Sequence, residues 1–173
     1  SNVAIGYQSL ASNTTASYNT AVGYQAAYSN TTGADNTAMG TAALYPNTTG
    51  NYNTAFGSAS LRQNTTGSNN TALGQSALNQ NTTMSRNTAV GFEAAYSNTT
   101  GSGVAAFGAT ALRSNTTGRS NTAIGGWDAT DGIIGPMYYN TTGSYNVGVG
   151  TGALSSNTTA PRNTAVGYQS LYA

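Results

Sequence analysis

Residues 19–35 have the sequence NTAVGYQAAYSNTTGAD, and this stretch decides the fold because it recurs along the whole chain of 173 residues. Its opening phrase, Asn-Thr-Ala-apolar-Gly, begins at positions 19, 36, 53, 70, 87, 121 and 163, and degenerate copies begin at Asn2, Val104 and Asn146. Successive copies start 17 residues apart, except that the step from position 121 to position 146 is 25 residues. A fixed period of this length is typical of solenoids. The repeat is numbered below as columns 1 to 17, with column 1 at the asparagine of the opening phrase.

The apolar residues of the repeat lie in fixed columns. Column 4 always holds a large apolar residue, and column 9 holds leucine or alanine in most copies. A unit with so few sizeable apolar residues cannot bury a hydrophobic face alone, so successive units must stack on one another. We expect columns 4 and 9 to point inward and to face each other across a narrow interior. The predicted core ladder of column 4 is Ile5, Val22, Met39, Phe56, Leu73, Val90, Phe107, Ile124, Val149 and Val166.

The repeat predicts short strands and turns, because glycine and β-branched residues recur every few positions and no period near 3.6 is sustained. We expect extended segments at columns 1 to 4 and 6 to 10, joined by turns at the column 5 glycine and at the Asn-Thr-Thr phrase. The fold class is therefore all-β, a parallel β-solenoid or β-roll of about ten 17-residue coils. Like residues would stack on like, with ladders of Asn and Thr and with Tyr7 on Tyr24 and Tyr28 on Tyr45.

The period divides the chain into parts of one solenoid that spans residues 1–173. Seven regular coils span 2–120, a coil with an eight-residue insertion spans 121–145, and two further coils, the last incomplete, span 146–173. The invariant glycine beside the alanine of column 3 has two interpretations. It is either a tight corner within one coil or part of a smooth stripe where solenoids pack side by side. The end repeats are close to consensus and carry no polar cap, so we also expect end-to-end assembly into a filament.

The composition argues against most other functional classes. Only 5% of residues are charged, the formal net charge is +1, and Lys, His and Cys are absent. No field is available to attract nucleic acid, and no run is long enough for membrane insertion. Disulfides and thiolate metal sites are excluded, and the commonest general base is missing. We therefore predict no enzyme activity, no cofactor and no metal.

Two stretches resemble known families. Residues 2–12, NVAIGYQSLAS, resemble the head repeat of trimeric autotransporter adhesins of the YadA type, and residues 19–33, NTAVGYQAAYSNTTG, resemble the low-complexity arrays of tail-fibre-like proteins that carry a chaperone-of-endosialidase domain. The resemblance spans nearly the whole chain. It implies a parallel β-roll, secretion or surface display, and an adhesive or shaft function, commonly as a trimer. The repeat here is longer than the adhesin head repeat, which leaves the oligomeric state less well defined than the coil.

Each Asn-Thr-Thr phrase is formally an acceptor for N-glycosylation. The alternative is that Asn and Thr are simply good turn residues, copied with the repeat. If sugars are present, they would form a line down one edge of the rod. The acceptors are Asn13, Asn30, Asn47, Asn64, Asn81, Asn98, Asn115, Asn140 and Asn157, and the sequence Asn69-Asn70-Thr71 adds another.

The insertion of repeat eight is the one clear break in the pattern, and it contains the single Trp of the chain. Loops on a regular scaffold often carry function, and Trp is a common anchor at interfaces. The residues of this contact loop would be Trp127, Asp128, Asp131, Tyr138 and Tyr139. The two acids offer too few ligands for calcium, and a catalytic pair is the least favoured interpretation. The alternative is an insertion that only packs its own apolar residues over the coil.

The sequence thus predicts a structural protein of an extracellular filament or of an adhesin or tail-fibre-like shaft. Its partners would be copies of itself, as a head-to-tail polymer or a lateral trimer, and surface glycans. An ice-binding or glycan-binding solenoid is the alternative, although the threonine of column 2 is expected to face inward with column 4. A polysaccharide-cleaving tailspike would need paired acids in a groove, for which only Asp128 and Asp131 are candidates.

Overall fold

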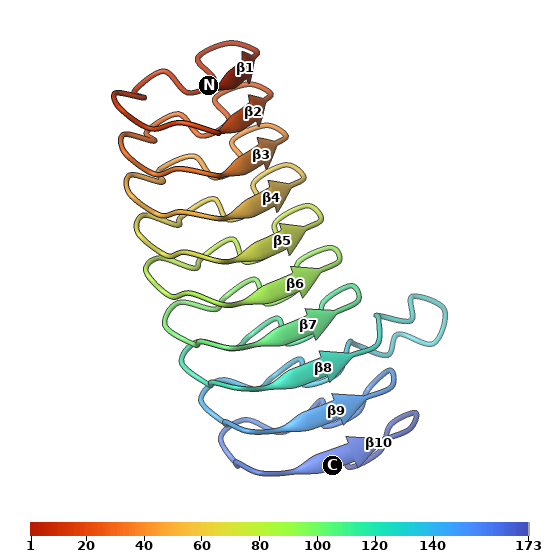
Figure 1. Ribbon diagram of the computed structural model, residues 1–173. Coiled ribbons are helices and arrows are strands. Elements are labelled where there is room, and N and C mark those ends of the chain that lie inside the picture. The colour runs from red at the N-terminus through yellow and green to blue at the C-terminus, as the bar shows by residue number, and fades with distance from the viewer. Residues whose placement is uncertain (173) are drawn as a thin grey trace.

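The computed structural model describes residues 1–172 and is a rod of stacked coils (Figure 1). Ten strands of three residues form one parallel sheet in chain order, which confirms the predicted parallel β-solenoid. The strands are β1 (Val3–Ile5), β2 (Thr20–Val22), β3 (Thr37–Met39), β4 (Thr54–Phe56), β5 (Thr71–Leu73), β6 (Thr88–Val90), β7 (Ala105–Phe107), β8 (Thr122–Ile124), β9 (Val147–Val149) and β10 (Thr164–Val166).

The register follows the sequence repeat. Thr20 pairs with Thr37, and across the insertion Thr122 pairs with Val147, so like columns always lie side by side. Backbone hydrogen bonds between coils continue outside the strands, as from Ala27 N–H to Ala43 O at 2.9 Å. The tyrosine stacks are also confirmed, since the rings of Tyr7 and Tyr24 lie 5.4 Å apart and those of Tyr28 and Tyr45 lie 5.2 Å apart.

The second predicted strand, at columns 6 to 10, is wrong. This part of each coil is a pair of tight turns, closed in the second coil by Ala26 N–H to Gly23 O and by Asn30 N–H to Ala27 O. Columns 7 and 9 take left-handed backbone angles, with φ of 53° at Gln25 and 49° at Ala27. Gln25 stands at the third position of the first turn, where a type II turn requires a left-handed residue, and Ala27 is the first residue of the second turn. The chain thereby reverses direction within a few residues.

The column 5 glycine forms a tight corner within the coil, which was the first of the two interpretations of this residue. Gly23 has a φ of 136°, and a Cβ built on it would lie 2.7 Å from the carbonyl oxygen of Gly40 in the next coil. Both the backbone angle and the close stacking therefore exclude a side chain. The column 3 alanines from Ala21 to Ala165 are buried, so the Ala-Gly stripe is not an exposed packing surface.

The core ladder predicted at column 4 is wrong, whereas column 9 does point inward. None of Ile5, Val22, Met39, Phe56, Leu73, Val90, Phe107, Ile124, Val149 and Val166 is buried. Phe56, for example, is 48% exposed, while the column 3 alanine beside it, Ala55, and the column 9 leucine of the same coil, Leu61, are fully buried. The interior is therefore built from alanines of columns 3 and 8 and leucines of column 9.

Strand alternation explains this inversion. Successive side chains of a strand point to opposite faces, so columns 1 and 3 share the inner face while columns 2 and 4 share the outer one. The column 1 asparagines are needed inside: Asn36 N–H donates to Asn19 Oδ1 at 2.9 Å, and Asn36 Nδ2 donates to Gly50 O at 2.8 Å. Because column 1 faces inward, column 4 must face outward.

A second ladder of asparagine amides runs along column 12. Asn47 Nδ2 donates to Asn30 Oδ1 at 2.7 Å, and Asn64 Nδ2 donates to Asn47 Oδ1 at 2.9 Å. Each Nδ2 also donates to a turn carbonyl of its own coil, as Asn64 does to Gly67 O at 3.0 Å. The amides are thus fully used within the rod, as buried polar groups require.

The corrected core predicts different effects for two apolar residues of the fourth coil. We expect Leu61→Ala to lower the free energy of unfolding by about 2–3 kcal/mol, because it opens a cavity between coils. Phe56→Ala should cost less than about 1 kcal/mol, because the side chain is half exposed. Denaturant unfolding followed by circular dichroism measures both, and equal losses would contradict the assignment of the core.

The column 12 ladder predicts that an isosteric change is not tolerated. Asn64→Asp puts a carboxylate against Asn47 Oδ1 and Gly67 O, so two donors are lost and a charge is buried. We expect a loss of at least about 3 kcal/mol in the free energy of unfolding. The introduced carboxyl should have a raised pKa, so the loss should shrink as pH falls and the group becomes neutral.

The matched control for this change is Asn69→Asp in the same coil, because Asn69 is exposed and belongs to no ladder. We expect it to change the free energy of unfolding by less than about 0.5 kcal/mol at any pH. A loss for Asn69→Asp as large as that for Asn64→Asp would show that column 12 has no special role.

Candidate functional site

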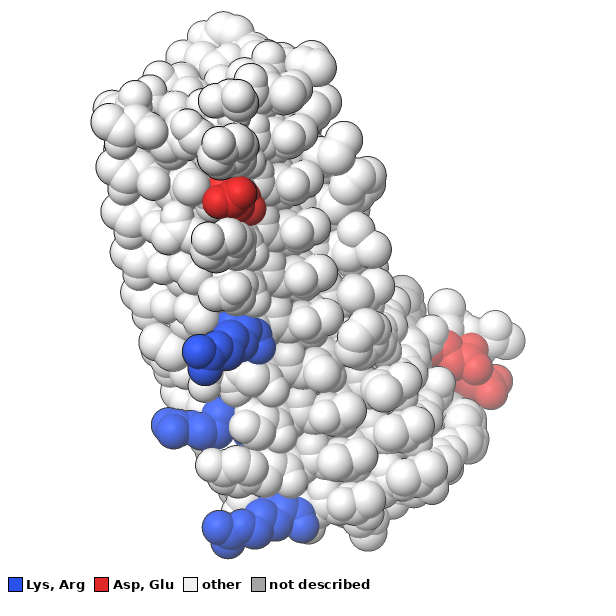
Figure 2. All heavy atoms as spheres, in the orientation of Figure 1, with Lys and Arg blue, Asp and Glu red and all other residues white. Residues whose placement is uncertain are grey.

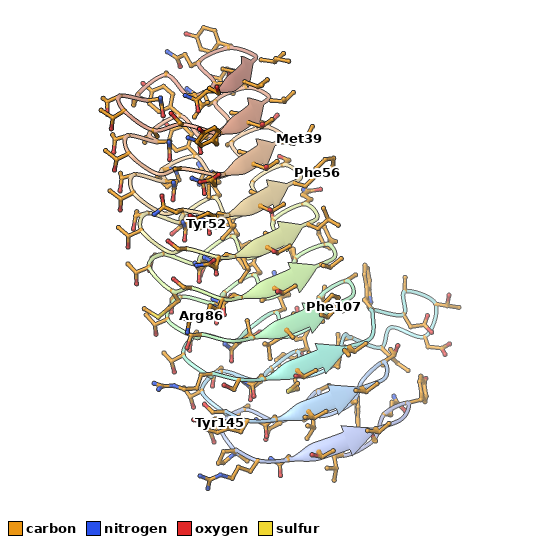
Figure 3. All side chains as sticks on the ribbon, viewed as in Figure 1. Met39, Tyr52, Phe56, Arg86, Phe107 and Tyr145 are labelled. Carbon is orange, nitrogen blue, oxygen red and sulfur yellow. The ribbon has the colours of Figure 1, made fainter. Side chains whose placement is uncertain are left out.

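The outer strand face, defined as the side chains of columns 2 and 4 on β1 to β10, carries a row of large apolar side chains along the rod. Met39, Phe56 and Phe107 lie in one line at the ends of their strands, and Tyr52 and Tyr145 of column 17 form a second line at the strand beginnings (Figure 3). Column 2 adds threonines that are exposed or half-buried. The expectation that column 2 faces inward is therefore wrong.

This side of the molecule is nearly uncharged. Figure 2 shows isolated charged side chains along one edge, and acidic atoms on the projecting loop at the other side. Columns 16 and 17 hold exposed charged residues, namely Asp35, Arg86, Arg119 and Arg162. Columns 2 and 4 contain no ionisable residue in any coil from β1 to β10. No charge on the outer strand face itself would therefore discourage an apolar partner.

The insertion of coil eight forms a projecting loop after β8 (Figure 1). The backbone leaves the coil after Trp127, whose N–H donates to Ala109 O at 3.1 Å. Asp128 and Ile133 then pair as a short antiparallel bridge, with N–H to O distances of 2.7 and 3.0 Å. On the return, Gly135 N–H donates to a hydroxyl of the preceding coil. Both stems of the loop are therefore fixed to the coil above.

The two acids of the loop have local roles. Asp128 Oδ1 accepts hydrogen bonds from the N–H groups of Thr130 at 2.9 Å and Asp131 at 3.3 Å, which closes the loop tip. Desolvation, and then the negative charges of Asp131 and Asp128, raise the pKa of the Tyr168 hydroxyl.

A hollow of about 290 Å³ lies between the insertion and coils six and seven. Phe92, Glu93, Arg113, Trp127 and Tyr138 are among its lining residues. Trp127 is 51% exposed and Phe92 is 42% exposed, so two aromatic rings stand at the opening. The hollow is therefore apolar on its aromatic sides and polar where the charged pair lies.

Arg113 and Glu93 form the polar wall. Arg113 Nε donates to Glu93 Oε2 at 2.6 Å, and this hydrogen bond raises the pKa of the guanidinium. The guanidinium also lies between two rings of column 10, at 5.4 Å from the centroid of Tyr96 and 5.6 Å from that of Tyr138. A cation between two aromatic faces is held in position. The side chains of column 10 therefore remain stacked in coils six to eight, with the guanidinium of Arg113 in the place of a tyrosine ring.

The predicted contact loop is brought together only in part. Trp127 and Tyr138 line the hollow. Asp128 serves the loop tip, and Asp131 is exposed there. Tyr139 is exposed and packs edge-on against Tyr138, with ring centroids 4.9 Å apart. Five residues of the hollow were not predicted from the sequence, namely Phe92, Glu93, Thr110, Arg113 and Ile134.

A sequence signal for the missed residues did exist. Phe92 and Glu93 stand in columns 6 and 7, where the first two coils and the last have Tyr and Gln, and Glu93 is the chain's only glutamate. It lies 20 residues before Arg113, which is one coil plus the three columns that separate columns 7 and 10. In a chain with so few charges, two opposite charges one coil apart indicate an ion pair.

The expectation that the asparagines of the Asn-Thr-Thr phrases are exposed is wrong, whereas their glycosylation stays a prediction. Their Nδ2 groups donate hydrogen bonds inside the rod, so a sugar has no room there. The buried set is Asn30, Asn47, Asn64, Asn81, Asn98, Asn115 and Asn140, while Asn13 and Asn157 are half-buried. Asn13 and Asn157 also donate through Nδ2, to Ala16 O at 3.2 Å and to Asn140 Oδ1 at 2.8 Å.

Residues 1–172 contain no group of three or more His, Cys, Asp or Glu side chains that could hold a metal ion. Over the same residues, no helix is long and apolar enough to cross a membrane. The chain matches no protein-family model, no curated protein and no solved structure. Its resemblance to adhesin and tail-fibre repeats accordingly stays a prediction.

The buried ladder predicts the glycosylation state of the folded chain. After production in a glycosylating secretory host, we expect no sugar on the buried asparagines of column 12, such as Asn47 and Asn64. The exposed sequon at Asn69 is the control, because a sugar there leaves the ladder intact. Glycopeptide mass spectrometry that locates sugars on Asn47 or Asn64 of folded protein would refute the buried ladder.

Proposed function

We propose that this chain is a structural rod, a shaft element of an extracellular fibre that associates side by side with copies of itself. The observation that carries the proposal is the outer strand face, where a row of exposed and half-buried apolar side chains in column 4 runs along a rod whose interior is already filled. Monomeric soluble proteins rarely expose contiguous apolar patches larger than a few hundred Å². The extracellular setting rests on the resemblance of the repeat to adhesin and fibre arrays.

The size of the outer strand face fits a protein partner. Six of the ten column 4 side chains are exposed and the other four are half-buried. At roughly 80 Å² for each exposed side chain and about half of that for each half-buried one, the column offers on the order of 600 Å². Each partner of a standard protein–protein interface contributes about 800 Å². A second copy of the chain could therefore cover this face with its own.

The shape of the face favours a partner with the same repeat. Column 4 side chains recur once per coil, about 4.8 Å apart along the rod, and only a surface with the same spacing matches them over its whole length. Val90 on β6 is half-buried between the exposed Leu73 and Phe107, which leaves a notch between two ridges. Ridges of one copy that fill notches of another would fix the register, as in other close-packed interfaces.

The ice-binding alternative is less well supported, although column 2 faces outward. Threonine is replaced in this column by Val3, Ala105 and Val147, so the threonine row is interrupted. The neighbouring row is column 4, where side chains as large as Phe56 and Phe107 project above the threonines. The face is therefore uneven, whereas an ice surface is flat. Thermal hysteresis of the purified protein tests this alternative directly.

The proposal predicts that one charge on the outer strand face weakens self-association. We expect Phe56→Asp to lower the affinity between copies at least about tenfold, because a carboxylate would be desolvated in an apolar interface. Sedimentation equilibrium over a range of concentrations measures this against a monomer mass of 17.4 kDa.

Gln63→Asp is the matched control, because it adds the same charge to the same coil at an exposed site in column 11. It should leave self-association unchanged. A wild-type protein that stays monomeric at all concentrations, or equal losses for the two variants, would contradict the proposal.

A further inference from the structure

We propose that the hollow beside the insertion binds a neutral sugar residue, such as a hexopyranose or N-acetylhexosamine unit of a glycan. This function is separate from self-association, because the lining residues belong to columns 6, 7 and 10 and to the insertion. No residue of the outer strand face takes part.

The hollow is a built feature of the fold. Phe92 comes from coil six, Arg113 from coil seven, and Trp127 and Tyr138 from the two stems of the insertion in coil eight. The loop stems are fixed by hydrogen bonds to coil seven, and the loop itself is closed by the bridge between Asp128 and Ile133. Binding would therefore require little ordering of the backbone, which favours affinity.

The aromatic walls suit the apolar face of a pyranose. Trp127 and Phe92 offer flat rings that are each about half exposed. Because apolar surface in contact with water is unfavourable, a ligand that covers these rings would gain free energy. A sugar ring has one face of C–H groups and a rim of hydroxyls. Its C–H face can pack on an aromatic ring while the rim remains available for hydrogen bonds.

The polar wall suits the hydroxyl rim. Glu93 uses Oε2 for Arg113, and its Oε1 accepts no hydrogen bond from another described residue. The Arg113 pair and its two flanking rings hold this carboxylate in place. A carboxylate in a fixed position can accept from a sugar hydroxyl, and such charge-assisted hydrogen bonds are the stronger ones.

The charges at the site argue against other ligand classes. Arg113 is neutralised by Glu93, and the nearby loop carries Asp128 and Asp131, so phosphate or an anionic sugar would meet no net positive charge. A volume of about 290 Å³ is at the lower end of ligand pockets and is too small for a lipid chain with its headgroup. A compact, uncharged and amphipathic group fits these constraints.

Trp127 provides a direct assay, because it is the only tryptophan of the chain and lines the hollow. Its fluorescence can be titrated in the full chain with methyl glycosides of glucose, galactose, mannose, N-acetylglucosamine and N-acetylgalactosamine. We expect at least one of them to shift the emission in a saturable way, with a dissociation constant of about 1 mM, as for other weak single-site binders.

The variants are chosen so that the fold tolerates them. Glu93→Gln and Phe92→Ala introduce residues that other coils already carry in columns 7 and 6, such as Gln25 and Ala109. Each should weaken binding about tenfold, which is the loss of one good contact. Tyr24→Ala is the matched control, because Tyr24 is an exposed aromatic residue of column 6 in a distant coil, and it should leave the dissociation constant unchanged.

Two results would overturn the proposal. In one, no glycoside shifts the Trp127 emission in a saturable way at concentrations up to about 100 mM, which is well above the dissociation constant expected for such a site. The other is a shift that Phe92→Ala and Glu93→Gln leave intact, or that benzyl alcohol produces equally well, since the hollow would then be only an unspecific apolar surface.

Discussion

The stacking of each coil on the next, at the spacing of a β-sheet, is the constraint on which the rest of the structure depends. In column 12, the amide of Asn115 donates to that of Asn98 at 2.7 Å, and the amide of Asn140 donates to that of Asn115 at 2.9 Å. Such a ladder forms only if the same residue returns at the same place in every coil. The repetition of the sequence is thus a consequence of hydrogen-bond geometry, and the insertion had to leave the chain in register on both sides.

The same constraint makes the rod thin and decides where large residues go. A 17-residue coil encloses little more than an alanine of column 3 opposite a leucine of column 9, as Ala55 and Leu61 illustrate. The interior leaves no space for a side chain as large as the phenylalanines that occur in some coils. The larger apolar residues of column 4 are therefore placed outside, where they form the surface on which the proposed self-association rests. The narrow interior therefore accounts both for the small residues of the core and for the large apolar residues on the outer strand face.

Much of the fold could be predicted from the sequence, but the orientation of its strands could not be predicted from hydrophobicity alone. The period sets the parallel register and the tyrosine stacks. The error at column 4 came from equating large with buried. Side chains in column 4 range from Val22 to Phe56, and a close-packed interior does not accept such differences in volume. Column 3, almost always alanine, has the constancy that an interior requires.

The turns at columns 7 and 9 were missed because Leu44, at a φ of 52°, takes a conformation that leucine rarely adopts.

The hollow beside coil eight depends on a break in the repeat. The insertion supplies one wall, and the substitutions at Phe92, Glu93 and Arg113 supply the others without disturbing the stack. The loop begins directly after β8, beside the outer strand face, and projects from the rod (Figure 1). A second copy that lies along this face meets the loop at coil eight, and its register must leave the loop clear. The break that creates the hollow therefore also limits how two rods can pair.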